Sequence, residues 1–113
     1  MKALNIIFKE QALLDLEEIW VYTFQHWSLQ QADRYHALLI KEIEFLAINP
    51  KSSKSQEHVR TGYRSSKVKS HIIFFRLLEG ELEVVRILHE RMISLIGYKI
   101  SNSAQQCIER QLG

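Results

Sequence analysis

The amino-acid sequence predicts an α+β domain: an N-terminal strand and an antiparallel two-helix hairpin packed on a small, twisted, mainly antiparallel β-sheet. Three observations support this architecture. Apolar residues recur at helical spacing over 10–48, apolar runs of strand length follow over 64–89, and 113 residues suffice for one hydrophobic core. We place the domain at 1–98 and assign 99–113 to a C-terminal extension, either a short helix or a disordered segment.

The chain is predicted to begin with a strand followed by a helix. Residues 3–8 form a short apolar run of strand type. A helix over 10–27 is predicted because bulky apolar residues recur three or four positions apart, which places them on one helical face. We expect that face to be buried, and it consists of Leu13, Leu16, Trp20, Phe24 and Trp27.

A second helix is predicted to begin after Ser28, because Ser28 and Gln31 form a capping-box pattern. The helix ends near Pro50, which cannot continue it. Because only Trp27 and Ser28 separate the two helices, we expect them to fold back as an antiparallel hairpin. The apolar face of the second helix consists of Ala32, Tyr35, Leu39, Ile43 and Leu46.

The second half of the chain is predicted to form the sheet. Residues 51–58 are polar and Ser-rich, so we expect an exposed loop. Three strands follow, over 64–69, 71–77 and 82–89, and their continuous apolar runs indicate that both faces of the sheet are largely covered. Glu79 and Gly80 are predicted to form the turn of the last hairpin.

That turn fixes the register of the hairpin. It places Arg76 opposite Glu83, where a cross-strand ion pair is expected. It places Arg86 opposite Ile73, and because an unpaired charge in an apolar strand is costly, Arg86 must have a partner. We consider three partners for Arg86: a bound anion, a carboxylate of another protein, or Glu17 or Glu18 on the first helix. His89 is either a structural histidine or part of a functional surface.

Basic residues are concentrated in the middle of the chain. Residues 51–76 contain seven basic and one acidic side chains, a balance of +6, whereas residues 1–50 contain four and seven, a balance of −3. This pattern is typical either of a surface that meets an anionic partner or of a solvated loop with Lys-guarded edge strands. The residues we expect to contact a target or partner are Arg60, Tyr63, Arg64, Lys67, Arg76, Arg86, His89 and Arg91.

Several classes of function are disfavoured. The single cysteine, Cys107, excludes an intramolecular disulfide and fits a reducing compartment, so we predict a cytoplasmic protein. No run approaches the ~18–20 apolar residues of a membrane span. The five histidines show no metal-ligand spacing, and the four glycines form no phosphate-binding loop. We therefore predict no membrane segment, no metal and no cofactor.

Six segments, in this order and spacing, resemble the ParE toxins of the ParE/RelE toxin superfamily. They span residues 4 to about 93, and the ordered set is more specific than any one of its members. The matching segments are A-L-L-D-L-E-E-I-W-V-Y at 12–22, W-S-L-Q-Q-A at 27–32, L-A-I-N-P at 46–50, R-T-G-Y-R at 60–64, H-I-I-F-F-R-L at 71–77 and V-V-R-I-L-H-E-R-M at 84–92.

The resemblance implies the toxin of a type II toxin–antitoxin pair. ParE toxins bind DNA gyrase and stabilise its cleaved-DNA complex without catalysing a reaction, so an indirect contact with DNA is also implied. RelE relatives share the fold but cut mRNA on the ribosome, and this is the alternative function. Against it, Ser94 stands about where a RelE-type tyrosine falls, and Tyr98 lies several residues late. A second alternative is an inactive family member that only binds antitoxin.

The resemblance also implies a cognate, ParD-like antitoxin whose C-terminal segment wraps the toxin. Four apolar helical residues lie off the two main apolar faces, more than two helices on one sheet need. We hypothesise that they line a groove for an amphipathic antitoxin helix with acidic flanks. These residues are Ile19, Val21, Phe45 and Ile48.

Overall fold

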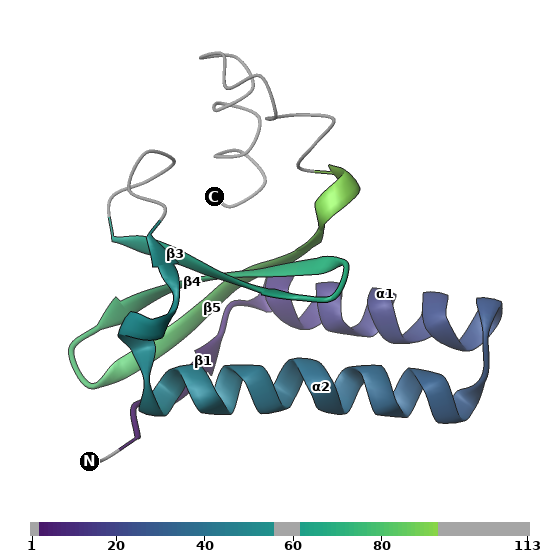
Figure 1. Cartoon of the computed structure of the whole chain (residues 1–113), viewed down its shortest axis with the longest axis horizontal. Coiled ribbons are helices and arrows are strands. Elements are labelled where there is room, and N and C mark those ends of the chain that lie inside the picture. The colour runs from purple at the N-terminus through teal and green to yellow at the C-terminus, as the bar shows by residue number, and fades with distance from the viewer. Residues whose placement is uncertain (1–2, 56–61, 93–113) are drawn as a thin grey trace.

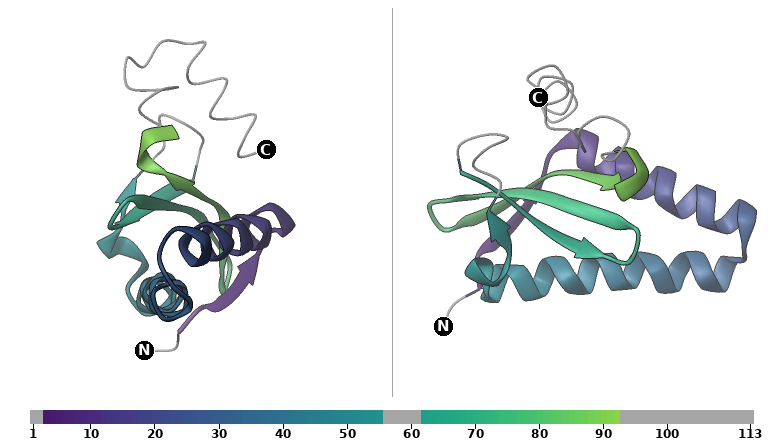
Figure 2. Two further views of the ribbon diagram at one scale, coloured as in Figure 1. Left: turned by 90° about the vertical axis from the view of Figure 1, so that its right-hand side faces the viewer. Right: turned by 45° about the horizontal axis from the view of Figure 1, so that its top comes forward.

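The computed structural model describes residues 3–55 and 62–92. Figure 1 shows a helical hairpin lying along one face of a twisted sheet, and Figure 2 shows the two layers from the side. Arg60, Ser94, Tyr98, Cys107 and the predicted extension over 99–113 lie outside the described residues. The elements are β1 (Asn5–Phe8), α1 (Glu10–His26), α2 (Leu29–Ile48), the 3-10 turn η1 (Pro50–Ser52), β2 (Lys54–Ser55), β3 (Tyr63–Val68), β4 (His71–Leu78) and β5 (Glu81–His89).

The α+β architecture predicted from the sequence is confirmed. The strands form one five-stranded sheet in the order β1-β5-β4-β3-β2. β1 pairs with β5 in parallel, and the other neighbours pair antiparallel. The loop predicted over 51–58 is partly wrong, because Lys54 and Ser55 pair with Ser65 and Arg64 as the short edge strand β2.

The second helix forms as its sequence predicts. The Ser28 hydroxyl accepts a hydrogen bond of 3.0 Å from the backbone N–H of Gln31, which satisfies one of the otherwise unpaired amides of the first turn. The helix ends at Ile48, two residues before Pro50. All five residues of the predicted apolar face are buried against α1 and the sheet: Ala32, Tyr35, Leu39, Ile43 and Leu46.

The predicted buried face of α1 is mostly wrong: Leu16 is buried and Trp20 partly buried, but Leu13, Phe24 and Trp27 are exposed. Trp27 is 76% exposed and Leu13 is 52% exposed, so most of the bulky apolar residues of this helix face solvent. The helix instead turns small and polar residues toward the core, where Asp15 bonds β5 and Thr23 is satisfied within its own helix. The Thr23 hydroxyl donates to the Ile19 carbonyl at 2.7 Å. The buried residues of α1 are Ala12, Asp15, Leu16 and Thr23.

The hairpin turns are close to their predicted positions. Glu79 and Gly80 connect β4 to β5, with Gly80 in the left-handed region at φ 71°, and Arg76 forms the predicted ion pair with Glu83. β3 ends one residue earlier than predicted, because Lys69 has a φ of 52° and forms the turn to β4 with Ser70.

A β-bulge overturns the register predicted for Arg86. Phe75 pairs with Val84 but Phe74 pairs with Arg86, so Val85 is an extra residue on β5. Arg86 therefore lies opposite Phe74 rather than Ile73. The register predicted from the turn was right only as far as the bulge, because no local sequence signal marks the inserted residue.

The partner of Arg86 is Asp15 of α1, not Glu17 or Glu18. Arg86 donates to the two Asp15 carboxylate oxygens from Nε at 2.7 Å and from Nη2 at 3.0 Å. The backbone N–H of Ile87 donates to the same carboxylate at 2.9 Å. Both side chains are largely buried, with exposed fractions of 12% for Arg86 and 5% for Asp15. One carboxylate therefore joins α1 to the strand just after the bulge.

Both faces of the sheet carry apolar clusters, as the continuous apolar runs predict. Toward the helices, Phe75, Leu82 and Val84 pack with residues of α1 and α2. On the opposite face, Phe74 and Val85 pack in a second cluster, together with Tyr63 and Leu88.

Removing the guanidinium of Arg86 should destabilise the domain, because Asp15 would remain as a buried carboxylate without its countercharge. We expect Arg86→Ala to lower the free energy of unfolding by about 3–5 kcal/mol, measured by urea unfolding. Arg34→Ala, at an exposed position of α2, is the control and should change stability by less than about 0.5 kcal/mol. Equal urea midpoints for Arg86→Ala and the wild type would contradict the assigned role of this ion pair.

Candidate functional site

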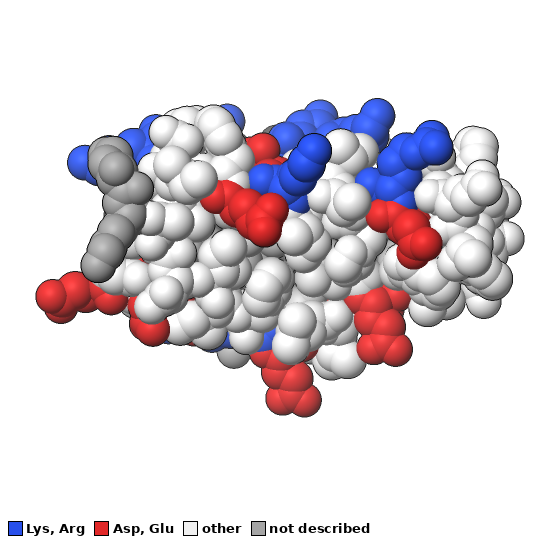
Figure 3. Space-filling model, turned by 90° about the horizontal axis from the view of Figure 1, so that it is seen from below, with Lys and Arg blue, Asp and Glu red and all other residues white. Residues whose placement is uncertain are grey.

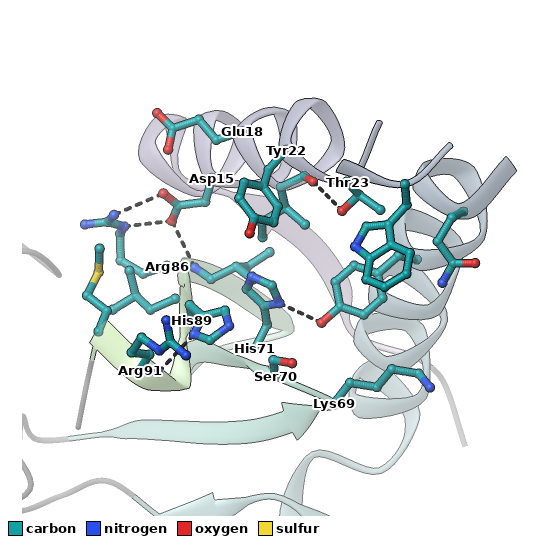
Figure 4. A pocket seen from close by; sticks show the side chains of 17 residues that line it. Asp15, Glu18, Tyr22, Thr23, Lys69, Ser70, His71, Arg86, His89 and Arg91 are labelled. Carbon is teal, nitrogen blue, oxygen red and sulfur yellow. Dashed lines mark hydrogen bonds and ion pairs between the residues drawn. The ribbon is translucent and has the colours of Figure 1, made fainter. Parts of the chain in front are cut away.

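A cavity of about 810 Å³ lies between the C-terminal half of α1 and the end of β5. Figure 4 shows side chains from α1, from the β3–β4 turn, and from β4 and β5 pointing into it. Its polar lining includes Lys69, His71, His89 and Arg91, and aromatic side chains from both helices complete the wall. A volume of this size is typical of sites that take small ligands or one segment of a larger partner.

Tyr35 and His71 connect the second helix to the sheet inside this cavity. The Tyr35 hydroxyl lies 2.6 Å from His71 Nδ1 and donates to the Val68 carbonyl at 3.2 Å. Tyrosine has one hydroxyl proton, so both contacts are satisfied when His71 Nδ1–H donates to the Tyr35 oxygen. Burial raises the pKa of the Tyr35 hydroxyl, which keeps it protonated.

His71 and His89 form an edge-to-face pair, with ring centroids 5.1 Å apart. Burial, with a smaller contribution from the neighbouring His89, lowers the pKa of His71 to about 4, so His71 is neutral near pH 7. His89 Nδ1 accepts the backbone N–H of Arg91 at 3.0 Å. The pair therefore offers an Nε2 acceptor on His71 and an Nε2–H donor on His89.

The described residues predicted to contact a partner fall into two groups. In the first group the side chain is buried or held by another residue. Tyr63 is buried, and Arg64 donates to the hydroxyl and the carbonyl of Ser53, both at 2.7 Å. Arg76 and Arg86 are held by Glu83 and Asp15.

The second group is accessible and clustered. Lys67 forms an ion pair of 2.6 Å with Glu90, in which both side chains are substantially exposed, and this contact lowers the pKa of the Glu90 carboxyl. His89 and Arg91 flank Glu90 in the chain, and both are exposed. Exposed ion pairs contribute little to stability, so these side chains remain available to a partner. We call Lys67, His89 and Arg91 the accessible basic cluster.

The four residues predicted to line an antitoxin groove occupy different environments. Ile19 packs against the core and lines the cavity. Val21, Phe45 and Ile48 are exposed on the helices. Figure 3 views the molecule from the side on which α2 lies in Figure 1. Uncharged residues cover most of this face, Lys and Arg lie along its upper border, and Asp and Glu are scattered over its middle and lower edge. The hairpin thus presents an apolar surface, although not one groove formed by these four residues.

Sequence reasoning missed several residues of the cavity, among them Asp15, Tyr22 and Lys69. Asp15 carried no usable signal, because adjacent helical positions point about 100° apart and its burial depends on the distant Arg86. Lys69 and Tyr22 carried none, since their place at the rim depends on a turn and on the rotation of α1.

Two kinds of feature are absent from the described residues: a group of metal ligands and a membrane-spanning helix. Within residues 3–55 and 62–92, no three His, Cys, Asp or Glu side chains are grouped as metal ligands. Neither α1 nor α2 is long and apolar enough to cross a membrane, and no other described segment is a candidate.

Comparison with known proteins identifies the family. Residues 6–94 match the model of the ParE toxin of the type II toxin–antitoxin system, parDE. This match covers most of the chain. The protein belongs to the ParE toxin family. The resemblance drawn from the six sequence segments is therefore confirmed, and the toxin of a type II toxin–antitoxin system is the class to which this chain is assigned.

Named relatives agree with this assignment. Toxin ParE1 of Mycobacterium tuberculosis (strain CDC 1551 / Oshkosh) is 41% identical over 78 residues, covering 68% of this chain and 80% of the relative. Toxin ParE1 of Caulobacter vibrioides is 37% identical over 82 residues, covering 73% and 84%. A solved structure described as the chromosomal ParDE TA system from P. aeruginosa shares the fold, with a TM-score of 0.68 and 15% identity over 77% of this chain and 96% of the other.

The low pKa of His71 predicts an acid-sensitive stability. In the unfolded chain this histidine titrates near its ordinary pKa of 6.5, whereas in the folded protein its pKa is about 4. The unfolded state therefore binds more protons between these values, and stability falls as the pH drops through this window. We expect wild-type protein to lose about 1.5 kcal/mol more than His71→Gln between pH 7 and pH 4, roughly half of the full shift because the ring is partly solvated. Urea unfolding at several pH values tests this, and parallel curves would contradict it.

Proposed function

We propose that this ParE-family protein acts in the cytoplasm, binds DNA gyrase and stabilises its cleaved-DNA complex, without catalysing a reaction itself. The observation that carries the proposal is the family match over residues 6–94, which spans the helical hairpin and the whole sheet. Gyrase bound to DNA is an anionic target, and a toxin with exposed basic side chains suits such a target.

The accessible basic cluster is the proposed target-contacting surface. Lys67, His89 and Arg91 lie at the ends of β3 and β5 and are exposed to solvent. Arg64, Arg76 and Arg86 are instead held by internal partners. Removing an accessible cation affects binding, whereas removing an internally held one also affects folding. Of the basic residues predicted from the sequence, we therefore assign the direct target contacts to the cluster.

The same arrangement argues against the ribonuclease alternative. Cleavage of RNA needs cations placed around the phosphate to stabilise its developing charge, together with an acid and a base. Three of the described arginines, Arg64, Arg76 and Arg86, make hydrogen bonds or ion pairs within the molecule instead. Binding to an anionic target needs only accessible positive charges, and not an acid, a base and cations placed around one phosphate.

We further propose that a ParD-like antitoxin neutralises this protein by covering the apolar surface of the helical hairpin. Val21, Phe45 and Ile48 would be covered in that complex, and each is exposed in the toxin alone. The apolar side of an amphipathic antitoxin segment fits the uncharged part of this face, and an acidic flank fits the border of Lys and Arg rather than the lower edge, where Figure 3 shows Asp and Glu.

Gyrase inhibition tests the first proposal. Purified toxin should inhibit DNA supercoiling and accumulate cleaved DNA in proportion to the toxin bound. Lys67→Ala and Arg91→Ala should each weaken inhibition about 10- to 150-fold, the equivalent of one charge-assisted contact of ~1.5–3 kcal/mol. Lys51→Ala, an exposed lysine of η1 outside the cluster, is the matched control and should inhibit like the wild type.

Two other outcomes would replace this proposal. Cleavage of translated mRNA while gyrase stays fully active would show a RelE-like ribonuclease. Binding to the antitoxin with neither activity would show a family member that has lost its target.

Antitoxin binding tests the second proposal. Phe45→Glu should weaken the affinity for the product of the neighbouring antitoxin gene by at least tenfold, because burying one large apolar side chain is worth about 1.5–3 kcal/mol. Titration calorimetry measures the affinity. Glu44→Gln, the exposed neighbour of Phe45, is the control, and equal affinities for both variants would place the antitoxin elsewhere.

A further inference from the structure

We propose that the cavity beside α1 binds one unstacked nucleotide of a single-stranded nucleic acid. The inference rests on the proposed function, because the strand would be the DNA that gyrase holds cleaved, but it adds a direct nucleic-acid contact by the toxin. Four features of the cavity carry it: its size, its exposed aromatic rings, its rim cations and its two imidazoles.

The aromatic rings at the cavity are suited to stacking on a base. Trp27 is 76% exposed and Tyr22 is 60% exposed, although both are large and partly apolar side chains. Tyr22 also stacks on His26, with ring centroids 3.9 Å apart, which holds its ring in place. Nucleobases stack on exposed aromatic rings of this kind irrespective of sequence.

The rim supplies cations for the phosphates. Lys69 and Arg91 both line the cavity, and no described carboxylate forms an ion pair with either. Lys69 holds a φ of 52°, a conformation that a lysine adopts only at a cost. The acidic residue Glu18 lies across the cavity from Lys69 in Figure 4, on the side away from the proposed phosphates.

The two imidazoles match the polar edge of a base. His71 presents a lone pair on Nε2 because its Nδ1–H donates to Tyr35. His89 presents an Nε2–H because its Nδ1 accepts from the backbone of Arg91. The edges of nucleobases carry hydrogen-bond donors and acceptors side by side, so an acceptor and a donor whose rings are 5.1 Å apart can serve both.

These features favour a nucleotide over an apolar peptide as the occupant. An apolar peptide segment would bury Lys69 and Arg91 without countercharges and leave the imidazole Nε2 atoms unpaired, and both are costly. A nucleotide places its phosphate at the cations, its base on the rings and its polar edge on the imidazoles.

Binding of short, fluorescently labelled single-stranded DNA at low salt, followed by anisotropy, tests the proposal on the full-length protein. Trp27→Ala and Lys69→Gln should each weaken binding about tenfold, and Lys69→Gln should also reduce the salt dependence by about one phosphate contact. The matched controls are Phe24→Ala, an exposed aromatic residue of the same helix, and Lys41→Gln, an exposed lysine of α2. Neither control lines the cavity, and both should bind like the wild type.

The outcomes separate this site from the proposed function. Toxin that poisons gyrase but binds no single-stranded DNA would overturn the nucleotide site and leave the function standing. DNA binding that depends on Trp27 and Lys69, in a protein that leaves gyrase active, would support the site and overturn the function. Equal losses in all four variants would show non-specific attraction, and a loss of antitoxin affinity alone would show a protein-docking site. Both of these results overturn the nucleotide proposal.

Discussion

The Asp15 carboxylate is the single group on which the arrangement of this fold depends most. It accepts both guanidinium hydrogen bonds from Arg86 and the backbone N–H of Ile87, so it serves a buried charge and a backbone amide at once. The extra residue Val85 disturbs the ladder just before these residues, and a disturbed ladder leaves polar groups in need of partners. An apolar side chain at position 15 could satisfy neither group. The bulge at Val85 therefore explains why a carboxylate, rather than an apolar side chain, is buried at position 15.

This attachment also explains why the cavity lies where it does. Asp15 fixes α1 to β5 near the start of the helix, and Ala12 and Leu16 pack against the sheet beside it. Beyond that point the helix runs on past the end of the strand, as Figure 1 shows. Tyr22, near the end of the helix, and Trp27, just after it, therefore line the cavity and stay exposed instead of packing into a core. The aromatic surface thus follows from the length of α1 and from the place at which it is fixed.

Much of the fold could be predicted because its signals are local. The Ser28 cap, the stop at Pro50 and the turn at Gly80 each depend on a few neighbouring residues, and the Arg76–Glu83 pair follows from that turn. The core face of α1 could not be predicted, because it is set by a contact between residues 15 and 86 rather than by the size of its apolar side chains. Asp15 and Thr23 occupy the core side. Thr23 is satisfied within α1 by the Ile19 carbonyl, but Asp15 finds its partners only in the folded molecule.

The same distinction applies to the basic residues of the candidate site. A count of charges along the chain treats every arginine alike, and it correctly indicates a basic middle segment. The fold then divides them, because Arg64 bonds Ser53 and Arg86 bonds Asp15, while Arg91 remains at the surface. Which residue falls in which group depends on partners far away in the sequence, so no spacing rule could have assigned them. A basic stretch therefore indicates that the protein can attract an anionic partner. The hydrogen bonds and ion pairs within the folded molecule then identify which basic side chains can reach that partner.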